Sequence, residues 1–281
     1  MIPPHLHSQL EMLVARKEGK LSGRRRIAVF DLDNTLLVGD IGEAVFARLL
    51  RDGARLACGW KEYESFLRCD QSAAYRLVVE TMAGLSPAEV ERATIKVLSQ
   101  PEPFIEVEGT GVPVPRVNRT MREFAAEVQE LGYEVYVISA SNQTSVRIVC
   151  EDFFGISPKR CFGLELSVAG GRFTNVLKTP YPIGAGKVEL YRAIAGDLLP
   201  QITATDSFID APLLSLTDPL GLSVWVGKSR MEFKAVRDRL RLPQHLCFVQ
   251  RPMDQNLRKR VRILGEQWSR VDDSPSAITE M

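Results

Sequence analysis

Short apolar runs separated by helical patterns recur along this chain. Residues 27–30 (Ile-Ala-Val-Phe) are apolar without interruption, which is typical of a strand buried on both faces of a parallel sheet. Comparable runs predict further strands at 135–138, 202–205, 222–226 and 246–249. Because helical patterns lie between these runs, the alternation predicts an α/β fold, a three-layer Rossmann-like core around a parallel sheet.

The pattern changes between residues 41 and 115, where helical spacing replaces short apolar runs. The clearest stripe consists of Tyr75, Val78, Val79 and Met82. Ser86-Pro87-Ala88-Glu89 is a capping box with proline at the first helical position, and predicts the start of another helix. No strand pattern is recognised in this block. We therefore expect an all-helical cap inserted into the core.

The two ends of the chain differ in character. Residues 3–18 predict a helix with one apolar face, which would pack on the core or on a second subunit and so allows a homodimer. From about residue 254 onward the chain is polar and is expected to be helical before it frays. The predicted divisions are 1–24 (N-terminal helical extension), 25–40 (first part of the core), 41–115 (cap), 116–252 (second part of the core) and 253–281 (polar tail).

Composition narrows the class of protein. The chain has 281 residues, of which 45% are hydrophobic and 25% charged, as in ordinary soluble proteins. A formal net charge of +1 argues against nucleic acid or an acidic membrane surface as the main partner. No apolar run is long enough to span a bilayer, and the first residues lack a signal-peptide pattern. Five cysteines without a CxxC pair favour reduced thiols and a cytoplasmic location.

Polar residues follow three of the predicted strands. They are Asp31, Asp33 and Thr35 after the first strand, Ser139 after another, and Asp206 and Asp210 after a third; Lys187 begins a helix. Each has an ordinary alternative, because Asp and Ser cap helices and most lysines are solvated. The carboxyl ends of parallel strands share one edge of a sheet, however, so these groups can converge. Together they predict a phosphate and metal site.

These motifs, in this order, resemble those of the haloacid dehalogenase superfamily. Asp31-Leu32-Asp33-Asn34-Thr35 resembles its first motif, the segment around Ser139 its second, and that around Lys187 its third. Residues 205–210 (TDSFID) resemble the fourth, with Thr205 in place of a glycine. The inserted cap is similar to that of the branch that contains phosphoserine and phosphorylcholine phosphatases. The resemblance implies hydrolysis of a phosphate ester.

The resemblance also implies individual roles. Asp31 would be the nucleophile that forms an aspartyl-phosphate, and Asp33 would protonate the leaving alcohol and then activate water. The implied phosphate-binding residues are Thr35, Ser139, Ala140 and Lys187. Mg²⁺ is the implied cofactor, because oxygen ligands and phosphate share the site. Its implied ligands are Asp31, Asp33 through its main-chain carbonyl, and Asp206, with Asp210 acting close by, directly or through water.

The chain departs from phosphoserine phosphatases on the substrate side. Asp40 stands where they carry glutamate, and Val78 occupies the position of the arginine that binds the substrate carboxylate, with Arg76 nearby. Aromatic residues in the cap could surround a cationic head group, although filling the core of the cap is the more ordinary role for them. These aromatics are Trp60, Tyr63, Phe66, Tyr75 and Phe104. Asp40 is thus a candidate substrate residue for an amine-bearing ligand.

The sequence therefore predicts a Mg²⁺-dependent phosphatase that hydrolyses a small phosphorylated metabolite through an aspartyl-phosphate. Phosphorylcholine, phosphoethanolamine and phosphoserine are candidate substrates. Two alternatives stay open. A phosphotransferase would use the same intermediate but resolve it with an alcohol in place of water, and a phosphatase-like module could bind a ligand without turnover.

Overall fold

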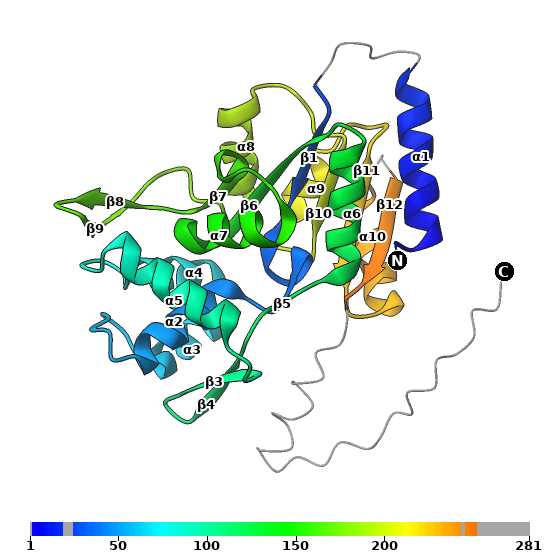
Figure 1. Cartoon of the computed structure of the whole chain (residues 1–281). Coiled ribbons are helices and arrows are strands. Elements are labelled where there is room, and N and C mark those ends of the chain that lie inside the picture. The colour runs from blue at the N-terminus through cyan, green and yellow to red at the C-terminus, as the bar shows by residue number, and fades with distance from the viewer. Residues whose placement is uncertain (1, 19–24, 243–244, 252–281) are drawn as a thin grey trace, which may run out of the picture.

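A parallel sheet forms the centre of the molecule (Figure 1). The computed structural model describes residues 2–18, 25–242 and 245–251. The six-stranded sheet has the order β12-β11-β10-β1-β6-β7, and every adjacent pair is parallel. Its strands are β1 (Ile27–Phe30), β6 (Glu134–Asn142), β7 (Cys161–Leu164), β10 (Ile202–Thr205), β11 (Leu222–Gly227) and β12 (His245–Gln250). The expected α/β core is confirmed.

Helices cover both faces of this sheet. Alternate residues of β1 face opposite layers, because side chains along a strand alternate in direction: Ala28 and Phe30 belong to one core cluster, Ile27 and Val29 to another. The first layer contains α1 (Pro4–Glu18), α6 (Arg119–Glu130) and α7 (Gln143–Phe154). The second contains α8 (Ala185–Ala195), α9 (Ala211–Ser215) and α10 (Arg230–Leu240).

The N-terminal helix packs on its own chain. Leu6, Leu10 and Leu13 are 0%, 0% and 3% exposed, and α1 contacts β11 and β12. His5 Nε2 lies 2.9 Å from the carbonyl oxygen of Phe248 in β12. The helix was expected to pack either on the core or on a second subunit, and in the structure it packs on the core. The expected helical tail beyond residue 253 lies outside the described residues.

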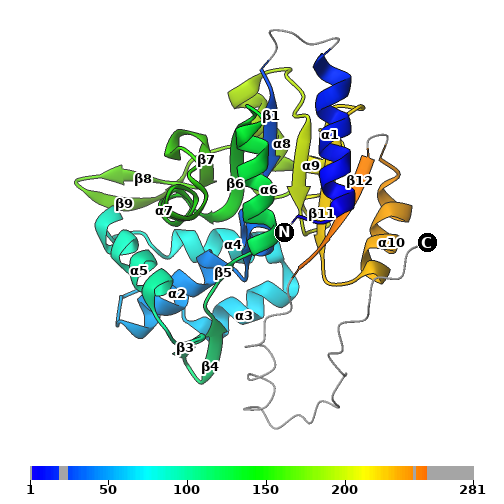
Figure 2. The same ribbon diagram turned by 45° about the vertical axis from the view of Figure 1, so that its right-hand side comes forward.

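The cap is inserted after β1 and lies where β1 and β6 end (Figures 1 and 2). The chain enters it through β2 (Leu37–Val38) and leaves through β5 (Arg116–Val117), which pair antiparallel. Its helices are α2 (Ile41–Arg51), α3 (Trp60–Cys69), α4 (Gln71–Glu80) and α5 (Pro87–Ser99). Side chains cap three of them, and the predicted capping box of Ser86 and Glu89 is present.

The expectation of an all-helical cap was wrong. Strands β3 (Phe104–Val107) and β4 (Thr110–Pro113) form an antiparallel hairpin that packs on α2. Ile105 and Val107 are buried while Glu106 between them is exposed, the alternation of a half-buried strand. The turn at Glu108 and Gly109 has positive φ at both residues, as a type I′ hairpin turn requires.

A second hairpin links the core to the cap. Strands β8 (Leu166–Ala169) and β9 (Arg172–Leu177) pair antiparallel on either side of Gly170 and Gly171. Backbone hydrogen bonds join β9 to the loop after α4: Gly84 donates to Phe173 O, and Phe173 donates to Leu85 O, both at 2.8 Å. The remaining short elements are a tight turn at Leu32–Leu36 and a single turn at Pro158–Arg160.

Two further expectations concern the cysteines and the apolar segments. All five cysteines carry free thiols. Within the described ranges, no helix combines the length and the apolar character that a membrane span requires.

Candidate active site

Asp31 directly follows β1, the strand that lies between β10 and β6. Its carboxylate is 5% exposed and accepts hydrogen bonds from the Leu32 N–H at 2.8 Å and the Thr205 hydroxyl at 3.3 Å. Lys187 Nζ lies 2.7 Å from Asp31 Oδ1. Burial raises the pKa of Asp31 well above its usual range, although Lys187 opposes this shift. The carboxylate thus depends on nearby cations to remain ionised.

Asp33 lies in the turn after β1. Its Oδ1 accepts the Ile41 N–H at the start of α2, and its Oδ2 accepts the hydroxyls of Ser139 and Ser141, all at 2.8 Å. Burial raises the pKa of Asp33, and these three hydrogen bonds limit the rise. Asn34 next to it has a φ of 56°, a conformation that asparagine tolerates. This turn holds Asp33 between the cap and β6.

Lys187 is the cation that contacts Asp31. The side chain is 1% exposed, and Nζ contacts Asp31 at 2.7 Å and Asp210 at 3.0 Å. Burial alone would lower the pKa of Lys187, but the carboxylates of Asp210 and Asp31 outweigh it and raise the pKa above its usual range. Asp210 also accepts the Gly184 N–H at 2.9 Å, just before α8. Asp210 therefore holds both Lys187 and the turn that begins its helix.

Asp206 follows β10 and has a cationic partner that the motifs did not reveal. Arg251 Nη1, just beyond β12, lies 3.3 Å from Asp206 Oδ2, and both side chains are largely buried. Burial raises the pKa of Asp206 to about 7, while Arg251 works in the opposite direction. The negative charge at this edge of the sheet is thus shared between Lys187 and Arg251.

Thr35 is fully buried, and its hydroxyl meets no hydrogen-bond partner among the described residues. A buried polar group without a partner calls for an explanation. The hydroxyl lies in the same turn as Asp31 and Asp33, where the sequence predicts a phosphate. A phosphoryl oxygen would satisfy it.

The oxygen atoms of the site can be compared with the ligands that a metal ion requires. In the described part of the chain, no three His, Cys, Asp or Glu side chains gather into a group that could hold one. Mg²⁺ does not need such a cluster, because it retains waters and is bound by one or two carboxylates together with substrate phosphate. Asp31 and Asp206, with the carbonyl of Asp33, meet that smaller requirement in chemistry and in number.

The cap side of the site contains an acidic pocket. This name denotes the cavity of about 10 Å³ between cap and core, room for a single water-sized group. Its lining residues are Asp40, Gly42, Glu43, Tyr63, Tyr75, Val78, Ala140 and Ser141. The Tyr63 hydroxyl donates to Glu43 Oε1 at 2.7 Å, and Asp40 Oδ1 accepts the Glu43 N–H. Two carboxylates and no basic side chain line this pocket.

Only part of the predicted aromatic set lies here. Tyr63 and Tyr75 line the acidic pocket, whereas Trp60 packs against Phe46 inside the cap, as the alternative interpretation held. The Arg76 guanidinium lies over the ring of Tyr181, 5.6 Å from its centre. Val78 lines the acidic pocket in place of a basic residue.

The sequence interpretation missed four polar residues of the site. Ser141 could have been found, since it lies two positions after Ser139 and so on the same side of an extended strand. Glu43 stands three residues after Asp40, which is the ordinary spacing of a capped helix start. This spacing therefore gave no sign that Glu43 also lines the acidic pocket. Thr205 was noted only as a replacement for glycine. For Arg251 there was no local signal, because β12 places it beside Asp206 from 45 residues away.

Close packing at α2 supports the arrangement. Gly42 donates its N–H to Ser141 Oγ at 3.1 Å, and a Cβ at this position would lie 2.7 Å from that oxygen. A side chain at residue 42 would therefore displace Ser141 or the first turn of α2.

Solved structures share this fold. A protein of unknown function from Bordetella pertussis Tohama I is 18% identical over 79% of this chain and 98% of its own, with a TM-score of 0.61. A functionally unknown protein from Anaerococcus prevotii DSM 20548 is 16% identical, and the match covers 85% of this chain and 90% of that protein, with a TM-score of 0.64. A phosphoserine phosphatase, solved as a phospho-aspartyl intermediate analogue, is 16% identical. The match covers 85% of this chain and 99% of that protein, with a TM-score of 0.50. These likenesses show the fold.

No curated protein matches the chain. The family model of haloacid dehalogenase-like hydrolases, however, matches residues 28–215, from β1 to the end of α9. That range spans most of the chain and contains every motif from Asp31 to Asp210. By its sequence and its fold, this chain belongs to the haloacid dehalogenase-like hydrolase family.

Proposed function

We propose that this protein is a Mg²⁺-dependent phosphatase that hydrolyses a small phosphomonoester through a phosphorylated Asp31. The observation that carries the proposal is the contact of 2.7 Å between Asp31 and buried Lys187, in the same turn region as the unpartnered Thr35 hydroxyl. A nucleophilic carboxylate, a cation and a free donor are the groups that phosphoryl transfer needs.

In the first step, a carboxylate oxygen of Asp31 attacks phosphorus and the bond from phosphorus to the ester oxygen breaks. Asp33 donates its proton to the departing oxygen, so that the alcohol leaves neutral. Burial raises the pKa of Asp33, which favours the protonated form that this step requires. Lys187 offsets charge on the phosphoryl oxygens, and Thr35, Ser139 and the N–H of Ala140 are the proposed hydrogen-bond donors.

In the second step, Asp33 takes a proton from water, and the oxygen of that water attacks phosphorus. The bond between phosphorus and Asp31 breaks, which releases inorganic phosphate and restores both carboxyl groups. An alcohol in place of water would make the protein a phosphotransferase. The small acidic pocket favours water, because it leaves little room for a second organic molecule.

Asp31, Asp206 and the main-chain carbonyl of Asp33 are the proposed ligands of Mg²⁺, which when bound neutralises phosphoryl oxygens and orients them for attack. The proposed role of Asp210 is to hold Lys187 through their ion pair. Any contact of Asp210 with the metal would pass through a water molecule. Arg251 forms an ion pair with Asp206. Use of the Asp206 carboxylate as a metal ligand would compete with this ion pair.

The acidic pocket supports an amine-bearing substrate. Asp40 and Glu43 can pair with an ammonium group, and the pocket is the size of one such group rather than of a trimethylammonium. Val78 leaves a substrate carboxylate without a cation there. We therefore propose phosphoethanolamine as a better substrate than phosphorylcholine or phosphoserine.

The proposed function is tested by assaying the purified protein with p-nitrophenyl phosphate and a panel of phosphorylated metabolites, with Mg²⁺ and with a chelator. We expect release of inorganic phosphate that depends on Mg²⁺. Transfer of the phosphoryl group to an added alcohol without phosphate release would indicate the phosphotransferase. Ligand binding without any turnover would identify a binding module and contradict the proposal.

The contacts of Lys187 lead to a prediction for Lys187→Met, which keeps the apolar stem and removes the charge. We expect kcat/KM to fall about a hundredfold, close to 3 kcal/mol in transition-state binding. Steady-state kinetics check this. Lys159→Met, at an exposed lysine, is the matched control and should leave activity unchanged. A loss of less than about tenfold for Lys187→Met would remove Lys187 from the proposed mechanism.

The same variant should lose stability in a pH-dependent way. In the fold the pKa of Lys187 is raised, so its contribution is fully present below its unfolded-state pKa of about 10.4. Without it, Asp31 and Asp210 are buried without their cation, and the raised pKa of Asp31 lets it take up a proton as the pH falls. Denaturant midpoints should therefore drop more at about pH 8 than at about pH 5.

A further prediction concerns the amine. Glu43→Gln keeps an acceptor for the Tyr63 hydroxyl but removes one of the two carboxylate charges. We expect KM for phosphoethanolamine to rise about tenfold, while kcat/KM for propyl phosphate, which lacks the ammonium group, changes little. Glu62→Gln, at an exposed glutamate of α3, is the control. Equal losses on both substrates would show that Glu43 only supports the cap.

A further inference from the structure

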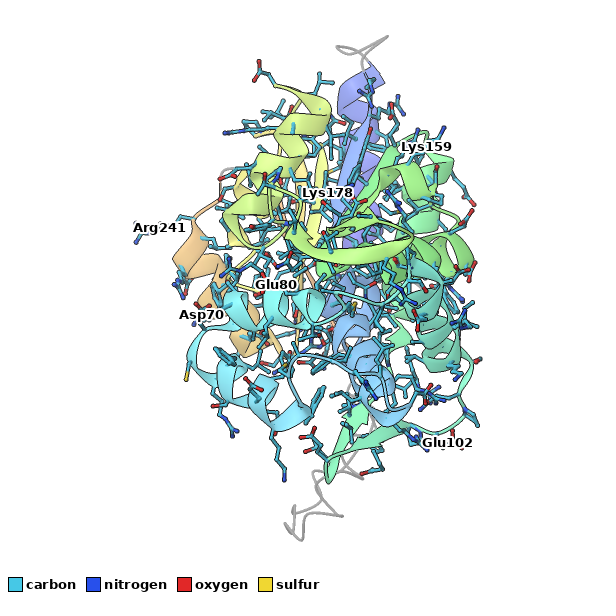
Figure 3. All side chains as sticks on the ribbon, turned by 90° about the vertical axis from the view of Figure 1, so that its left-hand side faces the viewer. Asp70, Glu80, Glu102, Lys159, Lys178 and Arg241 are labelled. Atoms are coloured by element: carbon cyan, nitrogen blue, oxygen red, sulfur yellow. The ribbon has the colours of Figure 1, made fainter. Side chains whose placement is uncertain are left out.

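A second cavity lies on the side of the cap–core junction that is covered by the β8–β9 hairpin. We call it the hairpin cavity; Val79, Asn142, Thr144, Arg147, Leu166 and Phe173 are among its lining residues. Its volume is about 190 Å³, much larger than that of the acidic pocket. Figure 3 faces this side: the hairpin crosses in front of the junction, with Lys178 toward the core and Glu80, at the end of α4, toward the cap.

One end of the hairpin cavity offers hydrogen-bond donors. Asn142 is 4% exposed and caps α7 through Oδ1, which accepts the Ser145 N–H at 2.9 Å. Its Nδ2 has no hydrogen-bond partner in the part of the chain that the structure describes. A buried donor of this kind is rare in folded proteins and calls for an explanation.

The charges around Asn142 favour an anion. Arg147, one turn further along α7, lines the cavity and forms no ion pair with a described carboxylate. Thr144 contributes a hydroxyl, and the first turn of the 12-residue helix α7 carries partial positive charge. The carboxylate among the lining residues, Glu165, is already paired with Lys178 at 2.9 Å.

The rest of the hairpin cavity is apolar. Val79 and Met82 of the cap lie on one side, and Leu166 and Phe173 of the hairpin lie on the other. A cavity of about 150 Å³ lined by such residues holds a benzene ring. A volume of about 190 Å³ therefore holds a ring-sized apolar group together with a small polar substituent.

We propose that the hairpin cavity binds a small organic anion, with its carboxylate or phosphate at Asn142, Thr144 and Arg147 and its apolar part between α4 and the β8–β9 hairpin. The proposal does not depend on the proposed function, because it concerns different residues. A ligand here contacts both the core and the cap. The ligand would add to the backbone hydrogen bonds of Phe173 with Gly84 and Leu85, which already join the hairpin to the cap.

Helix α4 connects this site to the acidic pocket. Val78 lines the acidic pocket, and its neighbour Val79 lines the hairpin cavity. A ligand that moves α4 therefore changes the wall of the acidic pocket without entering it.

The test uses 4-fluorobenzoate as the probe, with the full-length protein and fluorine NMR titration. We expect saturable binding with a dissociation constant of about 1 mM or tighter, as suits a ligand of roughly ten heavy atoms. Uncharged 4-fluorobenzamide should bind at least about tenfold more weakly if the anion is recognised. Absence of saturable binding, or equal affinity for the amide, would overturn the proposal and leave a solvent-filled cavity.

Two variants locate the probe. Asn142→Asp retains a good helix cap but replaces the unpartnered donor by a negative charge, and Arg147→Met removes the cation. We expect each to weaken binding at least about tenfold, whereas Arg119→Met, an equal change of charge at an exposed arginine of α6, should alter it less than about twofold. Unchanged binding to Asn142→Asp, with its melting curve confirming the fold, would place the probe elsewhere and contradict the proposal.

Discussion

Asp31→Asn is expected to abolish turnover while leaving the fold intact. The amide is nearly isosteric with the carboxylate and can still accept the Leu32 N–H, but it cannot attack phosphorus to form an acyl phosphate. We expect kcat to fall on the order of 10⁴-fold or more. The measurement is steady-state kinetics on protein verified by mass, because deamidation would restore the nucleophile.

Two observations complete this test. Asp70→Asn, at the exposed cap of α4, is the matched control, since asparagine caps a helix as well as aspartate does. Rapid quenching of the wild-type protein with labelled substrate should trap phosphate on Asp31. If Asp31→Asn retained wild-type turnover, the nucleophile would have to be another group.

Asp33→Asn is expected to separate the two steps of the reaction. An amide can neither protonate the leaving alcohol nor take a proton from water, and loss of such a group slows a reaction by about 10²–10⁴-fold. With an alkyl phosphate, both steps should slow. p-Nitrophenol leaves readily as an anion, so with p-nitrophenyl phosphate only the second step should slow. We therefore expect a burst of about one p-nitrophenol per protein, followed by little turnover.

Stopped-flow absorbance measures this burst. Asp152→Asn, at an exposed position of α7, should behave as wild type and serves as the control. The Asp33→Asn substitution also changes the carboxyl group that Ser139 and Ser141 contact, so the melting temperature of the variant is recorded alongside. A variant that loses the burst and the turnover equally would show that Asp33 positions the site rather than transferring protons.

Local patterns were sufficient to predict the edge of the sheet at which the site lies. The run that forms β1 contains no polar residue, which predicted a strand buried on both faces of a parallel sheet with the following polar residues at its carboxyl end. All four residues of β1 are buried in the structure. The same argument placed Ser139 and Asp206. The structure brings these groups together, because β6 and β10 are the two neighbours of β1. Their catalytic roles stay predictions.

The error in the cap has a local cause. Residues 104–113 contain only a short alternation of apolar and polar positions, which was not recognised as a strand pattern. The hairpin is stable because Ile105, Val107 and Val112 are buried against the cap, which the sequence pattern of the hairpin alone does not show. Marginal strands of this length depend on such tertiary packing.

By itself, the sequence determined the features that depend on neighbouring residues: the buried strands, the capped helices and the motif residues at strand ends. The tertiary structure decided which charges meet. Arg251 pairs with Asp206 because β12 lies parallel to β11 at the edge of the sheet, and Glu43 faces Tyr63 because α2 and α3 pack together in the cap. Asn142 lines a cavity that also has residues of α4 and of the β8–β9 hairpin in its wall, because α4 contacts β9. Such contacts join residues far apart in the chain, and their distances follow from packing rather than from local periodicity.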